Sequence, residues 1–159
     1  MNQFCIVIPN YNHTHAIAAV LDELKELQLP IIMVDDGSDA DAKQVFATLN
    51  AKYDFLTLIS HAQNQGKGGA VQTGLMAAYQ QGFSHAIQVD ADGQHSFADI
   101  SKLIELSNAS PNKVISGCPI YDSSVPKHRY LSRYITHFWV WVETLSFDIV
   151  DSMCGFRVY

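Results

Sequence analysis

Two carboxylates and an amide follow a short apolar segment near the middle of the chain. Asp90 and Asp92 stand two positions apart, directly after the segment His85–Val89, and Gln94 follows two positions later. Oxygen ligands of this kind suit Mg²⁺ or Mn²⁺, which proteins usually hold with one or two carboxylates and the phosphates of a substrate. A cation held in this way would neutralise a leaving diphosphate. An Asp-containing turn after a strand is also common without any ligand, so this motif alone leaves the structural interpretation open.

Two further polar loops also follow apolar segments. Residues 34–38 read VDDGS, and residues 64–69 read NQGKGG. The second loop is not a Walker phosphate-binding loop, because His61 occupies the place of the earlier Gly and no Ser or Thr follows Lys67. It is not a dinucleotide-binding loop either, because Val71 stands where the last Gly should be. Three acidic or Gly-rich loops that follow strands favour a common ligand site.

The elements that would carry these loops alternate along the chain, with short apolar runs between longer amphipathic segments. This alternation predicts an α/β fold, with a mostly parallel central sheet flanked by helices. Ligands of such sheets bind beyond the carboxyl ends of the strands, where the polar clusters fall. The expected strands are Phe4–Pro9, Pro30–Val34, Phe55–Ser60, His85–Val89 and Lys113–Gly117, and the expected helices are Thr14–Leu27, Asp39–Leu49, Gly69–Gln81 and Phe97–Ser107.

Two of these helices carry a capping pattern at their start. Ser38 with Asp41 and Ser96 with Asp99 have the S-x-x-D spacing in which a side-chain oxygen accepts from the first helical N–H groups. We therefore expect both serines to cap helices.

Length and composition favour one folded domain over residues 1–159. The chain has 159 residues and is 48% hydrophobic, which is enough apolar surface to offset the chain entropy lost on folding. The last residues, CGFRVY, read as the middle of a fold, so we expect the domain to be truncated at its C-terminus.

Charge and cysteine content narrow the partners and the location. The net charge of −6 would repel a phosphate backbone, so we expect no nucleic acid partner. The three cysteines are odd in number and widely spaced, which favours neither a disulfide framework nor a thiolate zinc site. The first residues lack the features of a secretory signal, and no apolar run approaches the roughly 18 residues of a membrane span. A cytoplasmic location with at most peripheral membrane contact is therefore expected.

The motifs IVIPNYN, VDDGSDAD, NQGKGGAV, VDADGQH and CGFRVY occur here in the order in which family 2 glycosyltransferases carry them. The chain resembles that family over nearly its whole length, and it is similar to the polyprenyl-phosphate sugar synthase branch, such as dolichyl-phosphate mannose synthases. The resemblance implies a GT-A fold. It also implies inverting, metal-dependent transfer of a sugar from a UDP- or GDP-linked donor to a lipid-phosphate or hydroxyl acceptor, with Mg²⁺ or Mn²⁺, in cell-envelope glycan or glycolipid synthesis.

The resemblance also implies roles for individual residues. Asp35 would accept hydrogen bonds from the nucleoside, with Asp36 close to it, while Lys67 would sit beside the nucleotide. His13 stands where many relatives carry Glu, so contacts to the base would differ in that loop. The residues expected at the donor are Pro9, Tyr11, Asp35, Asp36, Lys67, Gly68, Asp90 and Ala91, and those expected at the metal are Asp90, Asp92 and Gln94.

A segment nearer the C-terminus combines basic and aromatic residues. Arg129 and Arg133 are spaced i, i+4 and would share one helix face, either as a solvated face or as a clamp for the donor diphosphate or an anionic acceptor. The following aromatics, Phe138, Trp139 and Trp141, are either ordinary core or an interfacial anchor at the surface of a membrane that holds a lipid acceptor.

Asp151 and Arg157 are the candidate residues for activating or binding the sugar acceptor. A neutral hydroxyl acceptor requires a general base, whereas a phosphate acceptor is already anionic. Asp151, three residues before CGFR, is the candidate base by resemblance, and a structural or acceptor-positioning role is equally compatible with its place. Arg157 would help to bind phosphate.

Two other functions remain open on the sequence. A sugar-phosphate nucleotidyltransferase shares a related fold and uses two Asp residues with Mg²⁺, but its glycine-rich Arg loop is absent here. A nucleotide-sugar-binding module without turnover would bind UDP or GDP with metal and yet release no nucleotide from a donor when acceptor is present.

Overall fold

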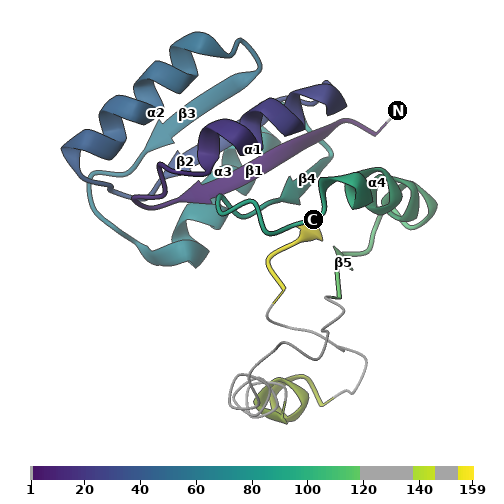
Figure 1. Ribbon diagram of the computed structural model, residues 1–159. Coiled ribbons are helices and arrows are strands. Elements are labelled where there is room, and N and C mark those ends of the chain that lie inside the picture. The colour runs from purple at the N-terminus through teal and green to yellow at the C-terminus, as the bar shows by residue number, and fades with distance from the viewer. Residues whose placement is uncertain (1, 119–137, 146–153) are drawn as a thin grey trace, which may run out of the picture. The chain divides into compact units, whose positions relative to one another are not determined.

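The computed structural model describes residues 2–118, 138–145 and 154–159 (Figure 1). The chain forms two compact units. One consists of residues up to Ile115 together with Phe156–Tyr159, and the other lies within Ser116–Gly155. The expectation of one domain over residues 1–159 stays a prediction.

The larger unit is built on a mostly parallel sheet, as expected from the alternating pattern. The strand order is β3-β2-β1-β4-β6-β5. Strands β1 to β4 run parallel to one another, whereas β6 runs antiparallel to β4. The strands are β1 (Phe4–Asn10), β2 (Ile31–Asp35), β3 (Leu56–Ser60), β4 (His85–Gln88), β5 (Ile115–Ser116) and β6 (Arg157–Val158).

The register of the sheet brings the polar loops to one edge. Asn10 at the end of β1 pairs with Asp35 at the end of β2, and Asp35 pairs with Ser60 at the end of β3. On the other side of β1, Val7 pairs with Gln88, and the Val89 N–H donates to the Val7 carbonyl at 3.0 Å. The loops that follow β1, β2, β3 and β4 therefore leave the sheet side by side.

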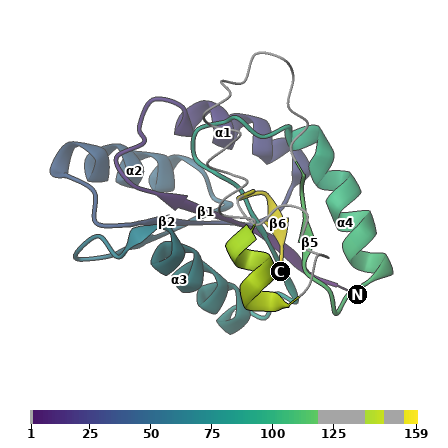
Figure 2. The ribbon, with the colours of Figure 1, turned by 90° about the horizontal axis from the view of Figure 1, so that it is seen from below.

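Within residues 2–118, four α-helices pack on the sheet. Figure 2 shows α1 and α2 on one face and α3 on the other. The chain reaches β4 by crossing back over β1 and β2, and this reversal places α3 opposite the first two helices. The helices are α1 (Ile17–Leu24), α2 (Ala40–Lys52), α3 (Gly66–Gln80) and α4 (Ile100–Ala109), with short 3-10 turns at Lys25–Leu27 and Phe97–Asp99.

The strands are buried because helices cover both faces of the sheet. All seven residues of β1 and all five of β2 are buried, which explains why these segments read as continuous apolar runs and not as an alternating pattern. Helix α3 approaches β1 so closely that a Cβ added at Gly74 would lie 2.3 Å from Val7 Cγ1. Only a residue without a side chain fits at this contact.

The expected helix starts are partly wrong. Helix α2 is capped by Asp39, whose carboxylate accepts from the Ala42 N–H at 2.9 Å, and not by Ser38. The Ser38 hydroxyl instead accepts from the Asn12 N–H, which ties the loop after β2 to the loop after β1. Ser96 precedes a 3-10 turn and makes no capping hydrogen bond with its side chain. At Ser38, the hydrogen bond to Asn12 takes the place of the expected capping bond.

Two strands also differ from expectation. The segment expected as a strand over Lys113–Gly117 contributes only Ile115–Ser116. Arg157–Val158 forms β6, a strand that no periodic pattern indicates, and Tyr159 extends the pairing through hydrogen bonds with Ala86 in both directions. The last residues of the chain thus complete the sheet beside β4.

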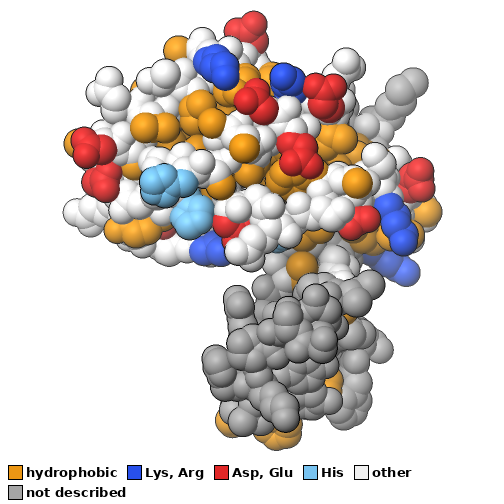
Figure 3. Space-filling model, viewed as in Figure 1, with side chains coloured by type: hydrophobic (Ala, Val, Ile, Leu, Met, Phe, Trp, Pro, Cys, Tyr) orange, Lys and Arg blue, Asp and Glu red, His pale blue; other side chains and the backbone are white. Residues whose placement is uncertain are grey.

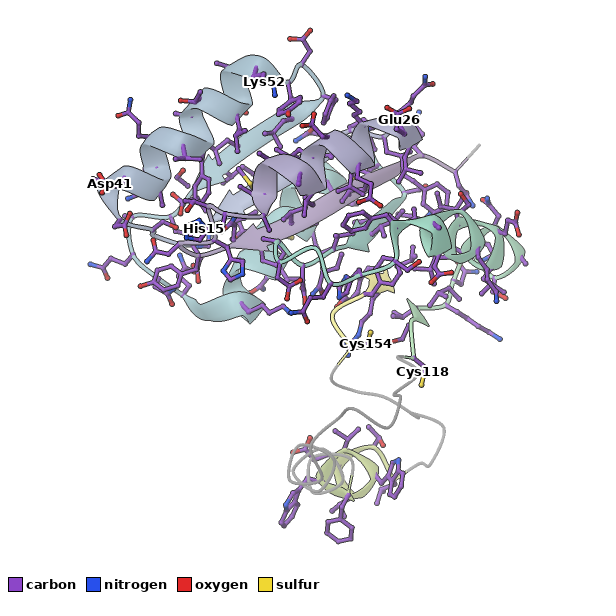
Figure 4. The ribbon with its side chains drawn as sticks, in the orientation of Figure 1. His15, Glu26, Asp41, Lys52, Cys118 and Cys154 are labelled. Carbon is purple, nitrogen blue, oxygen red and sulfur yellow. The ribbon has the colours of Figure 1, made fainter. Side chains whose placement is uncertain are left out.

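In the smaller unit, residues 138–144 are helical. Phe138 and Trp139 meet edge to face, with ring centroids 5.7 Å apart, and both side chains are more than half exposed. Figure 4 labels Cys118 and Cys154, and neither of them nor Cys5 forms a disulfide. None of the helices in the described parts of the chain is long and apolar enough to cross a membrane.

Candidate functional site

A cleft of about 320 Å³ opens at the carboxyl ends of the parallel strands. Residues from the loops after β1, β2, β3 and β4 line it, at the point where the strand order reverses between β1 and β4. Open α/β sheets bind their ligands at this kind of point. The lining residues are Pro9, Asn10, Tyr11, His13, Asp36, Asn64, Lys67, Ala70, Asp90, Ala91 and Asp92.

Asn10 shapes the first of these loops. Its side chain accepts from the His13 N–H at 3.0 Å and donates to the His13 carbonyl at 3.1 Å. Asn12 has a φ of 57°. Its side chain accepts from the Asp39 N–H at 3.0 Å, which is a second hydrogen bond that fixes this loop. These local bonds hold Tyr11, which is 53% exposed, at the mouth of the cleft.

The two acidic residues at the end of β2, Asp35 and Asp36, have different environments. Asp35 is fully buried, and one of its oxygens accepts from the Ser38 N–H at 2.9 Å. Asp36 lines the cleft, and its Oδ1 accepts from the Gln65 N–H at 2.9 Å. Gly37 makes the turn between them and Ser38 with φ of 75°, where an added Cβ would lie 2.6 Å from the backbone of the loop after β3.

The charge on Asp36 is supported by its surroundings. Burial disfavours the ionised form, but the hydrogen bonds from the Gln65 N–H and from His61 outweigh it and hold the pKa of the Asp36 carboxyl below its usual range. Asp36 is therefore an anion at neutral pH, in a position to accept hydrogen bonds from a ligand in the cleft.

Helix α3 begins at the cleft, three residues before the expected start. Gly66 opens it with φ of 81°, and its N–H is bonded to the Asn64 side chain at 3.0 Å. Lys67 in the first turn reaches the Asp90 carboxylate, with its Nζ 2.7 Å from Oδ1 and 2.8 Å from Oδ2. Lys67 is half-exposed and Asp90 is mostly covered, so this ion pair lies at the wall of the cleft.

The loop after β4 carries the second carboxylate. Asp92 Oδ1 accepts from the Gln94 N–H at 3.1 Å, and Gly93 makes the turn with φ of 70°. His95 lies behind this turn, with its Nε2 3.7 Å from Asp90 Oδ2 and its ring against Phe156 at 4.9 Å between centroids. The turn therefore presents Asp90 and Asp92 together to the cleft.

The donor set of this cleft fits a divalent cation that is completed by a substrate. Asp90 and Asp92 supply hard carboxylate oxygens, and the Lys67 ammonium group, which pairs with Asp90, would compete with a cation there. Within residues 2–118, 138–145 and 154–159, no three His, Cys, Asp or Glu side chains come together as a complete metal cage. Two carboxylates plus substrate phosphates is the usual arrangement for Mg²⁺.

Most residues expected at the donor or at the metal do meet in this cleft. Those brought together are Pro9, Tyr11, Asp36, Lys67, Asp90, Ala91 and Asp92. Asp35, Gly68 and Gln94 do not line the cleft. Arg129, Arg133 and Asp151 lie outside the described residues, and Arg157 lies in β6, opposite Gln88. The roles assigned to these side chains stay predictions.

Several lining residues were not expected from the sequence. Asn10, Asn64 and Ala70 belong to polar clusters or to the helix start that follows them, so their position after a strand was the available signal. His13, which was not among the residues expected at the donor or the metal, also lines the cleft, whereas His15, labelled in Figure 4, does not. Figure 3 shows histidines beside acidic and basic side chains on one face of the larger unit, so that face carries charges of both signs.

Fold and cleft together define an α/β domain with its ligand site at the carboxyl ends of parallel strands. The model of the glycosyl transferase family 2 matches residues 5–158, and the chain belongs to this family.

Curated relatives confirm the resemblance to the polyprenyl-phosphate branch. The UDP-N-acetylglucosamine–dolichyl-phosphate N-acetylglucosaminyltransferase of Methanococcus voltae is 29% identical, over 97% of this chain and 68% of the relative. The dolichyl-phosphate β-glucosyltransferase of Saccharomyces cerevisiae is 35% identical, over 97% of this chain and 53% of the relative. The human enzyme of the same name is 29% identical, over 99% and 54%. The chain thus spans about half the length of these glucosyltransferases.

Solved structures confirm the GT-A fold. The mannosyltransferase PcManGT of Pyrobaculum calidifontis, in complex with GDP-Man and Mn²⁺, superposes with a TM-score of 0.62 at 19% identity, over 74% of this chain and 36% of that one. TarS of S. aureus, in complex with UDP, gives a TM-score of 0.53 at 20% identity, over 76% and 38%.

Proposed function

We propose that this chain is the donor-binding core of an inverting, metal-dependent glycosyltransferase that takes its sugar from a UDP-linked donor and transfers it to a polyprenyl phosphate. The carrying observation is the cleft in which Asp36, Lys67, Asp90 and Asp92 meet. It provides a hydrogen-bond acceptor for the nucleoside, a cation for the diphosphate and two carboxylates for a metal.

The support for UDP and for a lipid phosphate comes from sequence relatives. The Methanococcus voltae relative is named for UDP-N-acetylglucosamine and dolichyl phosphate, and it aligns with almost the whole of this chain. The GDP-Man complex of the Pyrobaculum protein shares the fold only. A GDP-linked donor is therefore the second candidate.

Each side chain of the cleft has a distinct task in this proposal. Asp36, held as an anion, accepts hydrogen bonds from the nucleoside. Lys67 and the N–H groups of the first turn of α3 place positive charge near the diphosphate, because the start of a helix carries unpaired N–H donors. Asp90 and Asp92 would hold Mg²⁺ or Mn²⁺, which supplies charge neutralisation to the departing diphosphate.

The chemical nature of the sugar acceptor determines whether the reaction needs a general base. Inversion requires the acceptor oxygen to attack the anomeric carbon from the face opposite the leaving diphosphate, through a transition state with oxocarbenium character. A polyprenyl phosphate attacks as an anion and needs no proton removed. A hydroxyl acceptor would need Asp151 as its base. Arg129, Arg133 and Arg157 are the cations proposed for the phosphate groups of the donor or the acceptor.

Membrane contact follows from the acceptor. A polyprenyl chain stays in a bilayer, so we propose that the protein works at the cytoplasmic face, as a peripheral protein, in the synthesis of cell-envelope glycans or glycolipids. The half-exposed Phe138 and Trp139 are the candidate anchor.

Calorimetry of the purified chain with UDP and GDP, each with and without Mn²⁺, tests the donor site. We expect metal-dependent binding of UDP. No binding of either nucleotide under any condition would reject the proposal for this chain.

A transfer assay then separates an enzyme from a binding module. The chain is incubated with UDP-glucose or UDP-N-acetylglucosamine, Mn²⁺ and a short polyprenyl phosphate, and UDP release is measured. Release that depends on the acceptor supports a transferase. Tight binding of UDP without any release, with every acceptor offered, supports a nucleotide-sugar-binding module.

A further inference from the structure

His61 is a buried residue to which the donor-binding scheme assigns no task. It follows the last residue of β3, and both nitrogens of its ring are bonded. Its Nδ1 lies 2.8 Å from Asp36 Oδ1, and its Nε2 lies 2.9 Å from the Thr73 hydroxyl in α3. Because an ionised carboxylate can only accept, the Nδ1–H group donates to Asp36. One imidazole thus connects β2, β3 and α3.

The Asp36 oxygen that accepts from His61 also accepts a second hydrogen bond. Asp36 Oδ1 also accepts from the Gln65 N–H at 2.9 Å. The backbone is fixed on both sides, because the Asp36 N–H donates to the Asn10 carbonyl at 2.8 Å and the His61 N–H donates to the Asp35 carbonyl at 2.8 Å. With the backbone and one oxygen held, the carboxylate has a single orientation at the wall of the cleft.

Packing alone does not account for a histidine at this position. His61 is 9% exposed, and a buried imidazole must have its polar atoms bonded to avoid a desolvation cost. An apolar side chain would fill the space between β3 and α3 without that requirement. The polar atoms of His61 point to Asp36, which lines the cleft, and to Thr73, on the helix whose first turn carries Lys67.

We propose that His61 is a positioning residue for donor recognition. It orients the Asp36 carboxylate toward the nucleoside and ties that carboxylate to α3, the helix that carries Lys67. The inference rests on the proposed function, in which the cleft binds a nucleotide donor. It extends the set of residues that determine donor affinity beyond those that line the cleft.

Conservative variants separate the two ends of the His61 connection. In His61→Asn the side-chain amide nitrogen lies near the place of Nδ1, so the bond to Asp36 is retained and the bond to Thr73 is lost. In His61→Gln the amide reaches the place of Nε2, so the bond to Asp36 is lost. Thr73→Val serves as a matched control. It removes the hydrogen bond between His61 and Thr73 and leaves the bond between His61 and Asp36 in place.

Calorimetric affinity for UDP with Mn²⁺ is the first measurement. We expect His61→Gln to weaken binding about tenfold, the loss of a positioned charge-assisted hydrogen bond. His61→Asn and Thr73→Val should stay within about threefold of the unmodified chain, because the Asp36 contact survives. The thermal stability of each variant is measured alongside its affinity. If His61 had only a structural role, the variants would rank in affinity by their stability and not by which hydrogen bond they lose.

A second measurement needs no nucleotide. The carboxyl carbon of Asp36 is followed by NMR during an acid titration of each variant. Its titration should move to higher pH in His61→Gln. It should move less in His61→Asn, which keeps the hydrogen bond to Asp36 but loses the charge interaction with His61.

The outcomes are distinct. If the unmodified chain binds neither UDP nor GDP, the proposed function fails and this inference fails with it. If the unmodified chain binds UDP and His61→Gln binds it equally well, only the inference for His61 is overturned. If the loss of affinity in His61→Asn, His61→Gln and Thr73→Val follows the loss of stability in each variant, His61 is a structural residue.

Discussion

The Lys67 ammonium group lies within 2.8 Å of both oxygens of the Asp90 carboxylate. Asp90 is one of the two carboxylates that we propose as metal ligands, so a resident cation already occupies the place where a divalent cation would bind. The ion pair joins the first turn of α3 to the loop after β4 and closes one side of the cleft. A divalent cation held by Asp90 would compete with Lys67 for the carboxylate oxygens, and the ammonium group would then be available to the diphosphate of the proposed donor.

Replacing Lys67 with methionine should strengthen the binding of Mn²⁺ in the absence of nucleotide. The ion pair is half-exposed, and exposed pairs contribute about 0.2–1 kcal/mol, so we expect affinity to rise by about 1.4- to fivefold. Electron paramagnetic resonance of the unbound ion measures this directly. At saturating Mn²⁺, UDP affinity should fall instead, because the diphosphate loses a cation.

Lys43→Met is the matched control for this experiment. Lys43 is an exposed lysine of α2 that does not line the cleft, so its replacement changes the net charge equally. Equal or weaker Mn²⁺ binding by Lys67→Met, relative to this control, would show that Lys67 and the metal do not compete.

Replacing Asp92 with alanine should abolish the metal dependence of donor binding while leaving the fold intact. Asp92 is partly exposed at the wall of the cleft, and its one described hydrogen bond is to the Gln94 N–H within the same turn. We expect UDP affinity with Mn²⁺ to fall at least about tenfold, to the value measured without metal, since losing one of two carboxylates removes half of the protein's ligands. Asp54→Ala, at an exposed turn before β3, is the control; unchanged affinity in Asp92→Ala would remove Asp92 from the site.

The sequence allowed the order of the elements to be predicted because the signals for the first four strands are local. Ile31–Asp35 is a run of buried, mostly β-branched or apolar residues, and Gly66–Gln80 buries Ala70, Gly74 and Ala78 at a spacing of four. Arg157–Val158 has no such signal, since it pairs with β4, about 70 residues earlier in the chain. Its place in the sheet depends on a non-local contact that no window of sequence contains.

The candidate site could be predicted to the level of loops but not of every side chain. The position of Asp90 and Asp92 after a strand placed them at the cleft. Which of Asp35 and Asp36 faces the cleft depends on where β2 ends, because successive residues of a strand point to opposite faces and strand ends are uncertain from sequence by a few residues. His61 bonds to residues 25 and 12 positions away, a pairing that appears only once the sheet and α3 are assembled.

The stability contributed by Asp36 should depend on pH in a defined direction. The pKa of this carboxyl is lowered in the folded protein because, although burial opposes it, the bonds from Gln65 and His61 favour the ionised form. A carboxyl with a lowered folded pKa stabilises the fold above its unfolded pKa, near 4, and the contribution is lost as pH falls through the folded value. At pH 7, Asp36→Asn should lower the free energy of unfolding by about 1–3 kcal/mol.

Urea unfolding at several pH values tests this dependence. The difference between the unmodified chain and Asp36→Asn should be constant from about pH 7 to pH 5 and should shrink below about pH 4. Glu26→Gln removes one negative charge from an exposed position, marked in Figure 4, and controls for the net charge. A difference that grows on acidification would contradict the assigned direction of the shift.

Replacing Gly74 with alanine should destabilise the protein, although alanine is a far better helix former than glycine. An added Cβ would lie 2.3 Å from Val7 Cγ1, a methyl group of a fully buried, β-branched residue that has no room to move. We expect a loss of about 1–3 kcal/mol in the free energy of unfolding, as for other overpacked cores.

A glycine of the same helix provides the matched control for Gly74. An added Cβ at Gly68 meets no atom within 4 Å, so Gly68→Ala should be neutral or should stabilise the fold by up to about 1 kcal/mol through helix propensity. The double variant Gly74→Ala with Val7→Ala should be more stable than the sum of the two single changes predicts, because the methyl group added at position 74 fits into the space that Val7→Ala leaves. Additive losses in urea unfolding would mean that α3 does not rest on β1 at this contact, and the position of Lys67 at the cleft would then need another explanation.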